Sequence, residues 1–286
     1  MLRPSSAVGG GSGGRNLAKN ETMEDEFTYA VIGKAMEVHR QVGPGVDEAY
    51  YHELLSIRMR EAGIHHLVRP REVLVHRGIV ADQFEADLIA PERAVIELKC
   101  LRSVFNGEHY TQIMSYMKLW RIGVGLLFDF AKESLVYRRV IYSPVPMPEL
   151  PPSDLLKDWP SSLTARDHNL ATAVCKAIVG LGHAYGLGYR DTTYRGLLAA
   201  ELIGEGFSCV SFPTAPLYCN ERLLGEVRCD CVAVEKLCAV RVLALREGIT
   251  PADRAILQTH LRLLGFRWGL IVNFGKRNLE ARWVTI

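Results

Sequence analysis

The sequence predicts an α/β protein of two tandem domains, each with a mixed central sheet flanked by helices. Two observations lead to this fold class: a repeat in constant register, and the order of apolar patterns within each repeat. The segments "VGPGVDEAYYHELLSIRMREAGI" and "YGLGYRDTTYRGLLAAELIGEGF" align at an offset of 143 residues, which pairs Gly45 with Gly188 and Asp87 with Asp230. After one inserted residue, "GVGLLFDF" aligns with "RWGLIVNF" at an offset of 144. A register kept over most of both halves indicates a duplicated domain.

Helices and strands follow one another in the first copy in an order that favours such a sheet. Apolar residues recur at helical spacing on both sides of "GPG", which separates the first two helices. The expected elements are helices 27–40 and 46–62, strands 72–76, 79–89 and 94–101, helix 108–120, and strands 124–130 and 135–140. A helix, a three-strand meander, a helix and a buried strand together form a mixed sheet with helices packed on it.

Two low-complexity segments set the domain boundaries. The first residues are rich in Gly and Ser, and six Pro lie between Pro144 and Pro160. These compositions are typical of a flexible tail and of a stiff, extended connector. We therefore expect a tail over residues 1–24, a first domain over 25–142, a Pro-rich linker over 143–165 and a second domain over 166–286.

The bulk composition is that of an ordinary globular protein, with 286 residues, 48% of them hydrophobic and 23% charged. The net charge of +2 neither requires nor excludes a nucleic-acid partner, because nucleic-acid contacts depend on a local basic patch. Seven Cys with no signal peptide ahead of them favour a reducing compartment. No apolar run reaches the roughly 18 residues of a membrane span. We expect a cytoplasmic protein without a membrane partner.

The stretch "FEADLIAPERAVIELKC" contains charged residues among apolar ones and is predicted to be a hairpin. Strands 84–89 and 94–100 are joined by a turn that contains Pro. Strand alternation places Glu97 and Lys99 on one face of the second strand and Asp87 on the polar face of the first. One interpretation is a solvated face with a surface ion pair, and the other is a site for chemistry. Whether Asp87 faces Glu97 depends on a register that the turn does not fix.

The second copy of this hairpin distinguishes the two interpretations. In "VRCDCVAVEKLCAVRVLAL" the apolar alternation is kept, but Arg241 and Leu243 stand in the places of Glu97 and Lys99. The fold therefore does not need that acid and that base. Their presence in the first copy therefore favours a site for chemistry.

Several motifs of the first copy together resemble one nuclease superfamily. Asp87 followed by Glu97-x-Lys99 resembles the active-site signature of the PD-(D/E)XK nucleases, which have a restriction-endonuclease-like fold. "GVDEAYY", with Gly45, Glu48 and Tyr51, resembles the name motif of the GxxExxY family within that superfamily. "VHRQVGPG", "HYTQIMSY" and "GVGLLFDF" fit the same family in order and spacing. The resemblance covers residues 27–142.

The resemblance implies a nuclease that hydrolyses DNA or RNA with Mg²⁺ or Mn²⁺. Asp87, Glu97 and Glu48 would be the metal ligands, since hard divalent cations prefer carboxylate oxygens. Lys99 would orient or help deprotonate the attacking water and stabilise negative charge. Gln112 would position the water or a phosphate oxygen, and Tyr116, one turn later, would share its face. The alternative is a non-catalytic module that keeps the fold and binds nucleic acid or protein.

The second copy is expected to be inactive. Arg241 at a metal-ligand position would repel a cation, and we expect its guanidinium to pair with Asp230 and also Asp191. Four cysteines, Cys219, Cys229, Cys231 and Cys238, are interpreted as buried free thiols rather than as a zinc site. The sequence leaves open whether this domain binds substrate, stabilises the first domain, mediates a homo-oligomer or contacts a protein partner.

Overall fold

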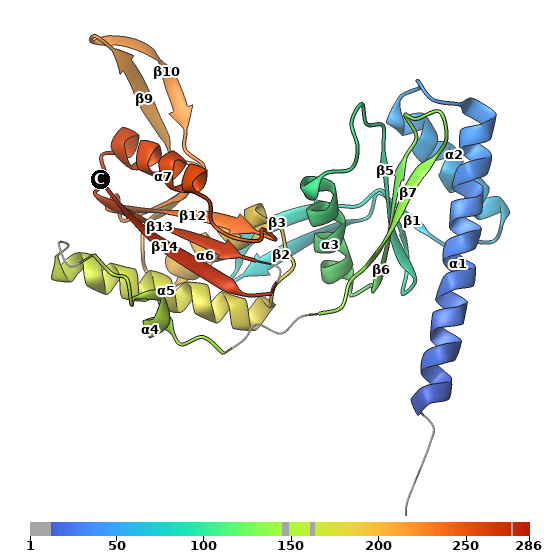
Figure 1. The fold of residues 1–286 in the computed structure, drawn as a ribbon, viewed down its shortest axis with the longest axis horizontal. Helices are drawn as coiled ribbons and strands as arrows, with labels where there is room; N and C mark the ends of the chain where they lie inside the picture. Colours follow the sequence, from blue (N-terminus) through green and yellow to red (C-terminus); the bar gives the residue numbers. More distant parts are fainter. Residues whose placement is uncertain (1–12, 145–148, 161–163, 276) are drawn as a thin grey trace, which may run out of the picture.

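The computed structural model describes residues 13–144, 149–160, 164–275 and 277–286 and has two lobes, each built on a five-stranded sheet (Figure 1). The strand orders are β1-β4-β5-β6-β7 and β14-β13-β12-β11-β8. In each sheet one pair of strands is parallel, β5 with β6 and β12 with β13, and the other pairs are antiparallel. Each lobe also carries a two-stranded ribbon, β2-β3 and β10-β9. The predicted fold class, two tandem domains with mixed sheets and flanking helices, is confirmed.

The elements of the two lobes occur in matching order. The first lobe contains α1 (Gly13–Val42), α2 (Glu48–Glu61), β1 (Leu67–Val68), β2 (Arg71–His76), β3 (Ile79–Glu85), β4 (Leu88–Ala90), β5 (Ala94–Lys99), α3 (Gly107–Trp120), β6 (Val124–Asp129) and β7 (Val136–Ile141). The second contains α4 (Pro152–Leu155), α5 (Ala165–Tyr185), α6 (Asp191–Gly204), β8 (Cys209–Ser211), β9 (Thr214–Cys219), β10 (Arg222–Arg228), β11 (Val232–Val234), β12 (Cys238–Ala244), α7 (Pro251–Leu264), β13 (Trp268–Phe274) and β14 (Leu279–Thr285). Among the described residues, no helix is long and apolar enough to cross a membrane.

Helices cover both faces of the first sheet. Ile96 and Leu98 of β5 belong to a core shared with α1 and α2. Val95, on the opposite face, packs in a second core with Ile113 and Met117 of α3. A strand covered on both faces is apolar at nearly every position. The side of β5 that holds Glu97 is therefore not a solvated face.

Two boundaries in the first lobe differ from those that the sequence predicts. The single strand expected over residues 79–89 is two strands, because the chain leaves the ribbon after Glu85 and joins the main sheet at Leu88. Asp87 lies in the bend between them. The first helix begins at Gly13 and so runs through part of the tail expected over 1–24, whose residues 1–12 lie outside the described part of the chain.

The expected Pro-rich linker is largely built into the second lobe. Trp159 packs edge-on against Trp268 and Trp283, with ring centroids 5.3 and 4.7 Å away. The indole N–H of Trp283 donates to the carbonyl of Leu155, in the short helix α4 (2.8 Å). Residues 149–160 therefore pack on the second domain instead of forming an extended connector, and residues 145–148 and 161–163 lie outside the described part.

The β2-β3 ribbon of the first lobe joins the two domains by lying on α6. Asp82 accepts hydrogen bonds from Arg190 and Thr193, and Arg77 at the ribbon tip pairs with Glu201 through two hydrogen bonds. The corresponding ribbon of the second lobe, β9-β10, projects away from the body (Figure 1). The two copies therefore contact each other head to tail, without a two-fold axis.

Gly196 on α6 provides a first testable prediction. A Cβ at this position would lie 1.9 Å from the backbone oxygen of Ala81, so the ribbon has to move if Gly196→Ala is made. We expect a loss of about 1–3 kcal/mol in the free energy of unfolding, measured by denaturant titration. Gly180→Ala is the matched control, because Gly180 lies in helix α5 with nothing within 4 Å of a built Cβ. It should stabilise by roughly 0.5–1 kcal/mol, and equal effects of the two variants would contradict the close approach.

Candidate functional site

Two hydrogen bonds hold Asp87 and Glu97 side by side, each between a carboxylate of one residue and the backbone at or next to the other. The backbone N–H of Asp87 donates to Glu97 Oε1 (3.1 Å), and the N–H of Leu98 donates to Asp87 Oδ2 (2.8 Å). Both bonds depend on the bend at Asp87, since it turns this residue's amide and carboxylate toward β5. The register that the turn left open is thereby settled, and the two carboxylates are neighbours.

Lys99 and Glu48 complete the polar group at the end of β5. Lys99 Nζ lies 3.2 Å from Glu97 Oε2, on the same side of the strand as alternation predicts. Glu48 is the first residue of α2, and its Oε2 accepts a hydrogen bond from the backbone N–H of Cys100 (3.1 Å). Helix α2 starts here because the preceding "GPG" turns with positive φ at Gly43 and Gly45. Glu48 therefore reaches the end of β5 from the first turn of α2.

Burial controls the charge state of this group. Glu97 is 1% exposed, and burial together with the charge of Asp87 raises its pKa to about 8. Burial also raises the pKa of Glu48. Burial lowers the pKa of Lys99, but the carboxylates of Glu97 and Asp87 outweigh this effect, so its pKa is raised overall. Lys99 is therefore an ammonium at neutral pH and donates hydrogen bonds.

Gln112 and Tyr116 lie on α3, which packs over the face of the sheet that holds Glu97. Gln112 Nε2 donates to the hydroxyl of Tyr116 (3.1 Å), so the two side chains share a face as predicted. Burial and the charge of Glu97 raise the pKa of Tyr116. In the described part of the chain, no hydrogen bond joins either residue to the three carboxylates. Gln112 instead lines a cavity of about 650 Å³ between the domains, together with Asp191 and Leu243 of the second domain.

The side chains present fit a hard divalent cation in part. Asp87 and Glu97 offer adjacent carboxylate oxygens, and burial and the charge of Asp87 raise the pKa of Glu97 even with the Lys99 ammonium beside it, so an added cation would favour its ionised form. Across the described residues, however, no three Asp, Glu, His or Cys side chains converge closely enough to hold a metal ion. The Glu48 carboxylate is engaged by the backbone of Cys100. Asp87 and Glu97 are thus the pair suited to a cation, with Glu48 adjacent.

Asp129 supports the site and was not singled out from the sequence. Its buried carboxylate accepts hydrogen bonds from the N–H groups of Leu101 and Ala131 (3.0 and 3.1 Å). Lys132, 3.4 Å from Asp129, donates to the carbonyl of Leu101 (2.6 Å). These contacts fix the chain directly after Lys99. The available signal was an acidic residue in the buried strand "GVGLLFDF", which the second copy replaces with Asn273.

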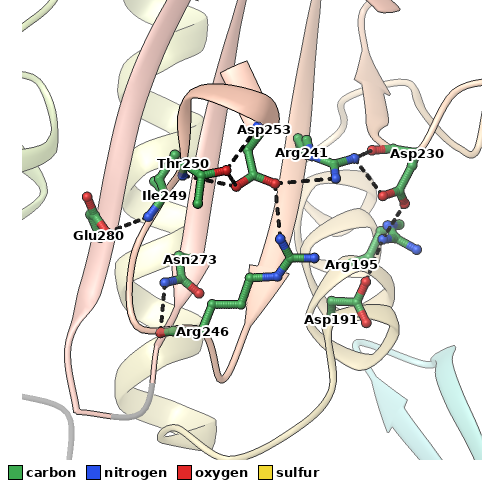
Figure 2. A network of polar contacts seen from close by, with 10 residues as sticks. All are labelled: Asp191, Arg195, Asp230, Arg241, Arg246, Ile249, Thr250, Asp253, Asn273 and Glu280. Atoms are coloured by element: carbon green, nitrogen blue, oxygen red, sulfur yellow. Dashed lines mark hydrogen bonds and ion pairs between the residues drawn. The ribbon is translucent and has the colours of Figure 1, made fainter. Parts of the chain in front are cut away.

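In the second domain the corresponding place holds a network of ion pairs (Figure 2). Arg241 lies 2.7 Å from Asp230, which confirms the expected pair, and it also approaches Asp253 (3.6 Å). Asp191 contacts Arg195 and not Arg241, so that part of the prediction is wrong. Arg195 also pairs with Asp230 at 2.6 Å. Arg241 thus supplies positive charge where the first copy has the carboxylate of Glu97.

The cysteines of the second copy agree in part with the expectation. Cys229, Cys231 and Cys238 are fully buried free thiols. Cys219 is exposed, which corrects the prediction that all four are buried, because it lies at the end of β9 in the projecting ribbon.

Comparison with protein families agrees with the two lobes. A family model described as the PD-(D/E)XK nuclease superfamily matches residues 25–140 and again residues 168–286. No match was found among curated proteins or among solved structures.

The raised pKa of Glu97 predicts how the metal-free protein responds to pH. Folded Glu97 keeps its proton up to about pH 8, whereas the unfolded chain releases it near 4.5. The free energy of unfolding should therefore fall as pH rises through this window. Thermal unfolding with EDTA between pH 5 and 9 measures this slope, which Glu97→Gln should reduce. At pH 8, Mg²⁺ should raise the melting temperature of the wild type and not of Glu97→Gln; an equal rise in both would contradict a cation at Glu97.

The two equivalent aspartates should respond oppositely to substitution. Above about pH 8, where Glu97 is ionised, Asp87→Asn removes the repulsion with Glu97 and can still accept the Leu98 hydrogen bond, so the metal-free protein should become more stable. Asp230→Asn leaves the buried guanidinium groups of Arg195 and Arg241 short of a counter-charge, and should cost roughly 2–4 kcal/mol. Denaturant titration in EDTA measures both, and a destabilised Asp87→Asn would show that the first pair is not repulsive.

Proposed function

The chain belongs to the PD-(D/E)XK nuclease superfamily, and we propose that it is a divalent-metal-dependent nuclease that hydrolyses phosphodiester bonds of DNA or RNA. Its active site is in the N-terminal domain, over residues 25–142, and the domain over residues 166–286 is inactive. Within the superfamily we assign it to the GxxExxY family, on the "GVDEAYY" motif at the start of α2.

One observation carries this proposal. A buried carboxylate, Glu97, beside the half-buried carboxylate of Asp87, with one ammonium for the two, is costly to maintain. The second copy shows that the same fold forms with Arg241 and Leu243 in the places of Glu97 and Lys99. Because folding does not require the costly group, its presence in the first copy supports a catalytic role.

The proposed ligands are Asp87 and Glu97, with Glu48 as a third contributor. Mg²⁺ or Mn²⁺ held there would supply the Lewis acid that neutralises phosphate charge and lowers the pKa of a water molecule. Glu97 must be deprotonated for this role, so a bound cation has to lower its pKa from about 8.

Lys99 has the role of a charged donor. Its ammonium, kept protonated by Glu97 and Asp87, donates to the attacking water or to a non-bridging phosphate oxygen and stabilises the negative charge that develops there. Gln112 faces the cavity between the domains, where its amide can hold a phosphate oxygen of the substrate, and Tyr116 fixes the orientation of that amide.

Activity against nucleic acid tests the proposal directly. The purified protein is offered single-stranded DNA, duplex DNA and RNA with Mg²⁺ or Mn²⁺, beside Asp87→Asn and Lys99→Ala. We expect cleavage by the wild type and a loss of at least about 10²-fold in each variant. Since Asp87→Asn is expected to be stably folded, its loss of activity would not reflect unfolding.

Equivalent carboxylates in the two domains provide the control. Glu48→Gln should reduce cleavage, whereas Asp230→Asn, at the second-domain position equivalent to Asp87, should lower stability but leave the kcat of the folded protein unchanged. Cleavage that persists in Asp87→Asn and Lys99→Ala would place the activity elsewhere or in a contaminant. Binding of nucleic acid without any cleavage would favour the non-catalytic module.

A further inference from the structure

The segment that leads into α6 contacts two elements next to the candidate active site, α3 and β3. The backbone N–H of Arg190 donates to Ser115 Oγ on α3 (2.9 Å), and Lys118 of α3 donates to the carbonyl of Leu187 (2.5 Å). The side chain of Arg190 reaches the other element, the end of β3. One short segment of the second domain thus touches the helix of Gln112 and the strand that leads to Asp87.

The guanidinium of Arg190 makes four contacts with the last residues of strand β3. Nε and Nη2 donate to the two carboxylate oxygens of Asp82 (3.0 and 2.8 Å), and Nη2 also donates to the carbonyl of Gln83 (3.0 Å). The group lies over the ring of Phe84, 4.9 Å from its centroid. Bidentate, charge-assisted hydrogen bonds of this kind fix orientation as well as position.

Phe84 links Arg190 to the residues of the candidate site. Its ring packs edge-on against Tyr116 (6.1 Å), the partner of Gln112, and tilted against Tyr189 of the second domain (6.2 Å). Three residues after Phe84 along the chain lies Asp87, whose amide and carboxylate are bonded to β5. Arg190 therefore restrains the ribbon end directly before the bend that brings Asp87 to Glu97.

The equivalent positions of the two copies could not make this contact if the domains exchanged roles. By the repeat register, the position of Arg190 is Asp47 in the first copy, and the positions of Asp82 and Phe84 are Gly225 and Val227 in the second. None of the three residue types is therefore required by the fold itself. The contact exists where the second domain meets the active-site elements of the first.

We propose that Arg190 is a positioning residue for the N-terminal site, through which the second domain holds β3 and α3 in the arrangement that the reaction needs. The proposal deepens the proposed function and rests on it for its catalytic part. Displacement of a reacting group by about 1 Å can lower the rate roughly 10²-fold, so a restraint on the residues before Asp87 has a direct effect on turnover. The inactive copy is thereby a built-in support for the active one.

The same interface supplies a matched control. Arg77 forms a second two-bond ion pair across the domains, with Glu201, at the opposite end of the ribbon (2.6 and 2.7 Å). Both Arg190→Ala and Arg77→Ala remove an interdomain ion pair, and both should lower the melting temperature. Only Arg190→Ala removes contacts next to Asp87 and Phe84.

The experiment compares the two variants in the full chain by hydrogen exchange and by steady-state kinetics. In Arg190→Ala, the amides of Asp87 and Leu98 should exchange at least about tenfold faster than in the wild type, whereas in Arg77→Ala they should be unchanged. With a nucleic-acid substrate and Mg²⁺, Arg190→Ala should lower kcat at least about tenfold with KM within about twofold, and Arg77→Ala should keep wild-type kcat. Arg190→Lys keeps the positive charge but cannot make the two-bond contact of the guanidinium with Asp82, so it should fall between Arg190→Ala and the wild type in both measurements. It replaces Arg190→Ala in the comparison if that variant does not fold.

The two readouts separate this proposal from the proposed function. If the wild type cleaves no nucleic acid, the nuclease function fails, but faster exchange at Asp87 and Leu98 in Arg190→Ala alone still supports the positioning role. If the two variants show the same exchange at these amides, or the same loss of kcat, Arg190 only holds the domains together and the proposal is wrong.

Discussion

The two domains bury charges of opposite sign at the same position of the sheet, and this difference determines most of what distinguishes them. In the first half, the carboxylate of Glu97 is enclosed by α3 beside Asp87, with Lys99 as the cation at its side. Removing an ionised carboxylate from water is costly unless a counter-charge is close. In the second half, Arg241 occupies this place and its charge is met by Asp230. In the first half, two carboxylates share one ammonium, so an added cation would be favourable. In the second half, the buried guanidinium already has an aspartate as its counter-charge.

Contacts that both copies retain show what the fold itself requires. The hydroxyl of Tyr51 donates to the carbonyl of Gly43, and that of Tyr194 donates to the carbonyl of Gly186, both at 2.6 Å. Each tyrosine thus closes the turn that starts the following helix. Tyr51 belongs to the motif by which the family resemblance was identified, yet the duplicate gives it a structural role. A motif can therefore combine residues that hold the backbone with residues such as Glu48 that face the site.

The sequence predicted the duplication, the mixed sheets and the separate sides of β5, because register and alternation record which positions are buried. It could not predict the bend at Asp87, since Phe84, Ala86 and Leu88 stay buried across it and the alternation continues while the chain moves from the ribbon to the sheet. It could not predict the Arg190–Asp82 contact either. These residues are not equivalent in the repeat, so only the packing of one whole domain on the other brings them together.

The head-to-tail contact between the domains uses features that α2 lacks. Where α6 has Gly196, which allows the backbone of Ala81 to approach, α2 has Glu53, and a Cβ at the former position already meets that backbone. The projecting ribbon also lacks the anchoring acid, because Gly225 stands in the place of Asp82. A heterologous interface repeats from one unit to the next only when both of its surfaces recur. The β9-β10 ribbon and α2 each lack the residues for this contact, so α2 cannot receive a ribbon as α6 does, and the contact between the two domains is not repeated.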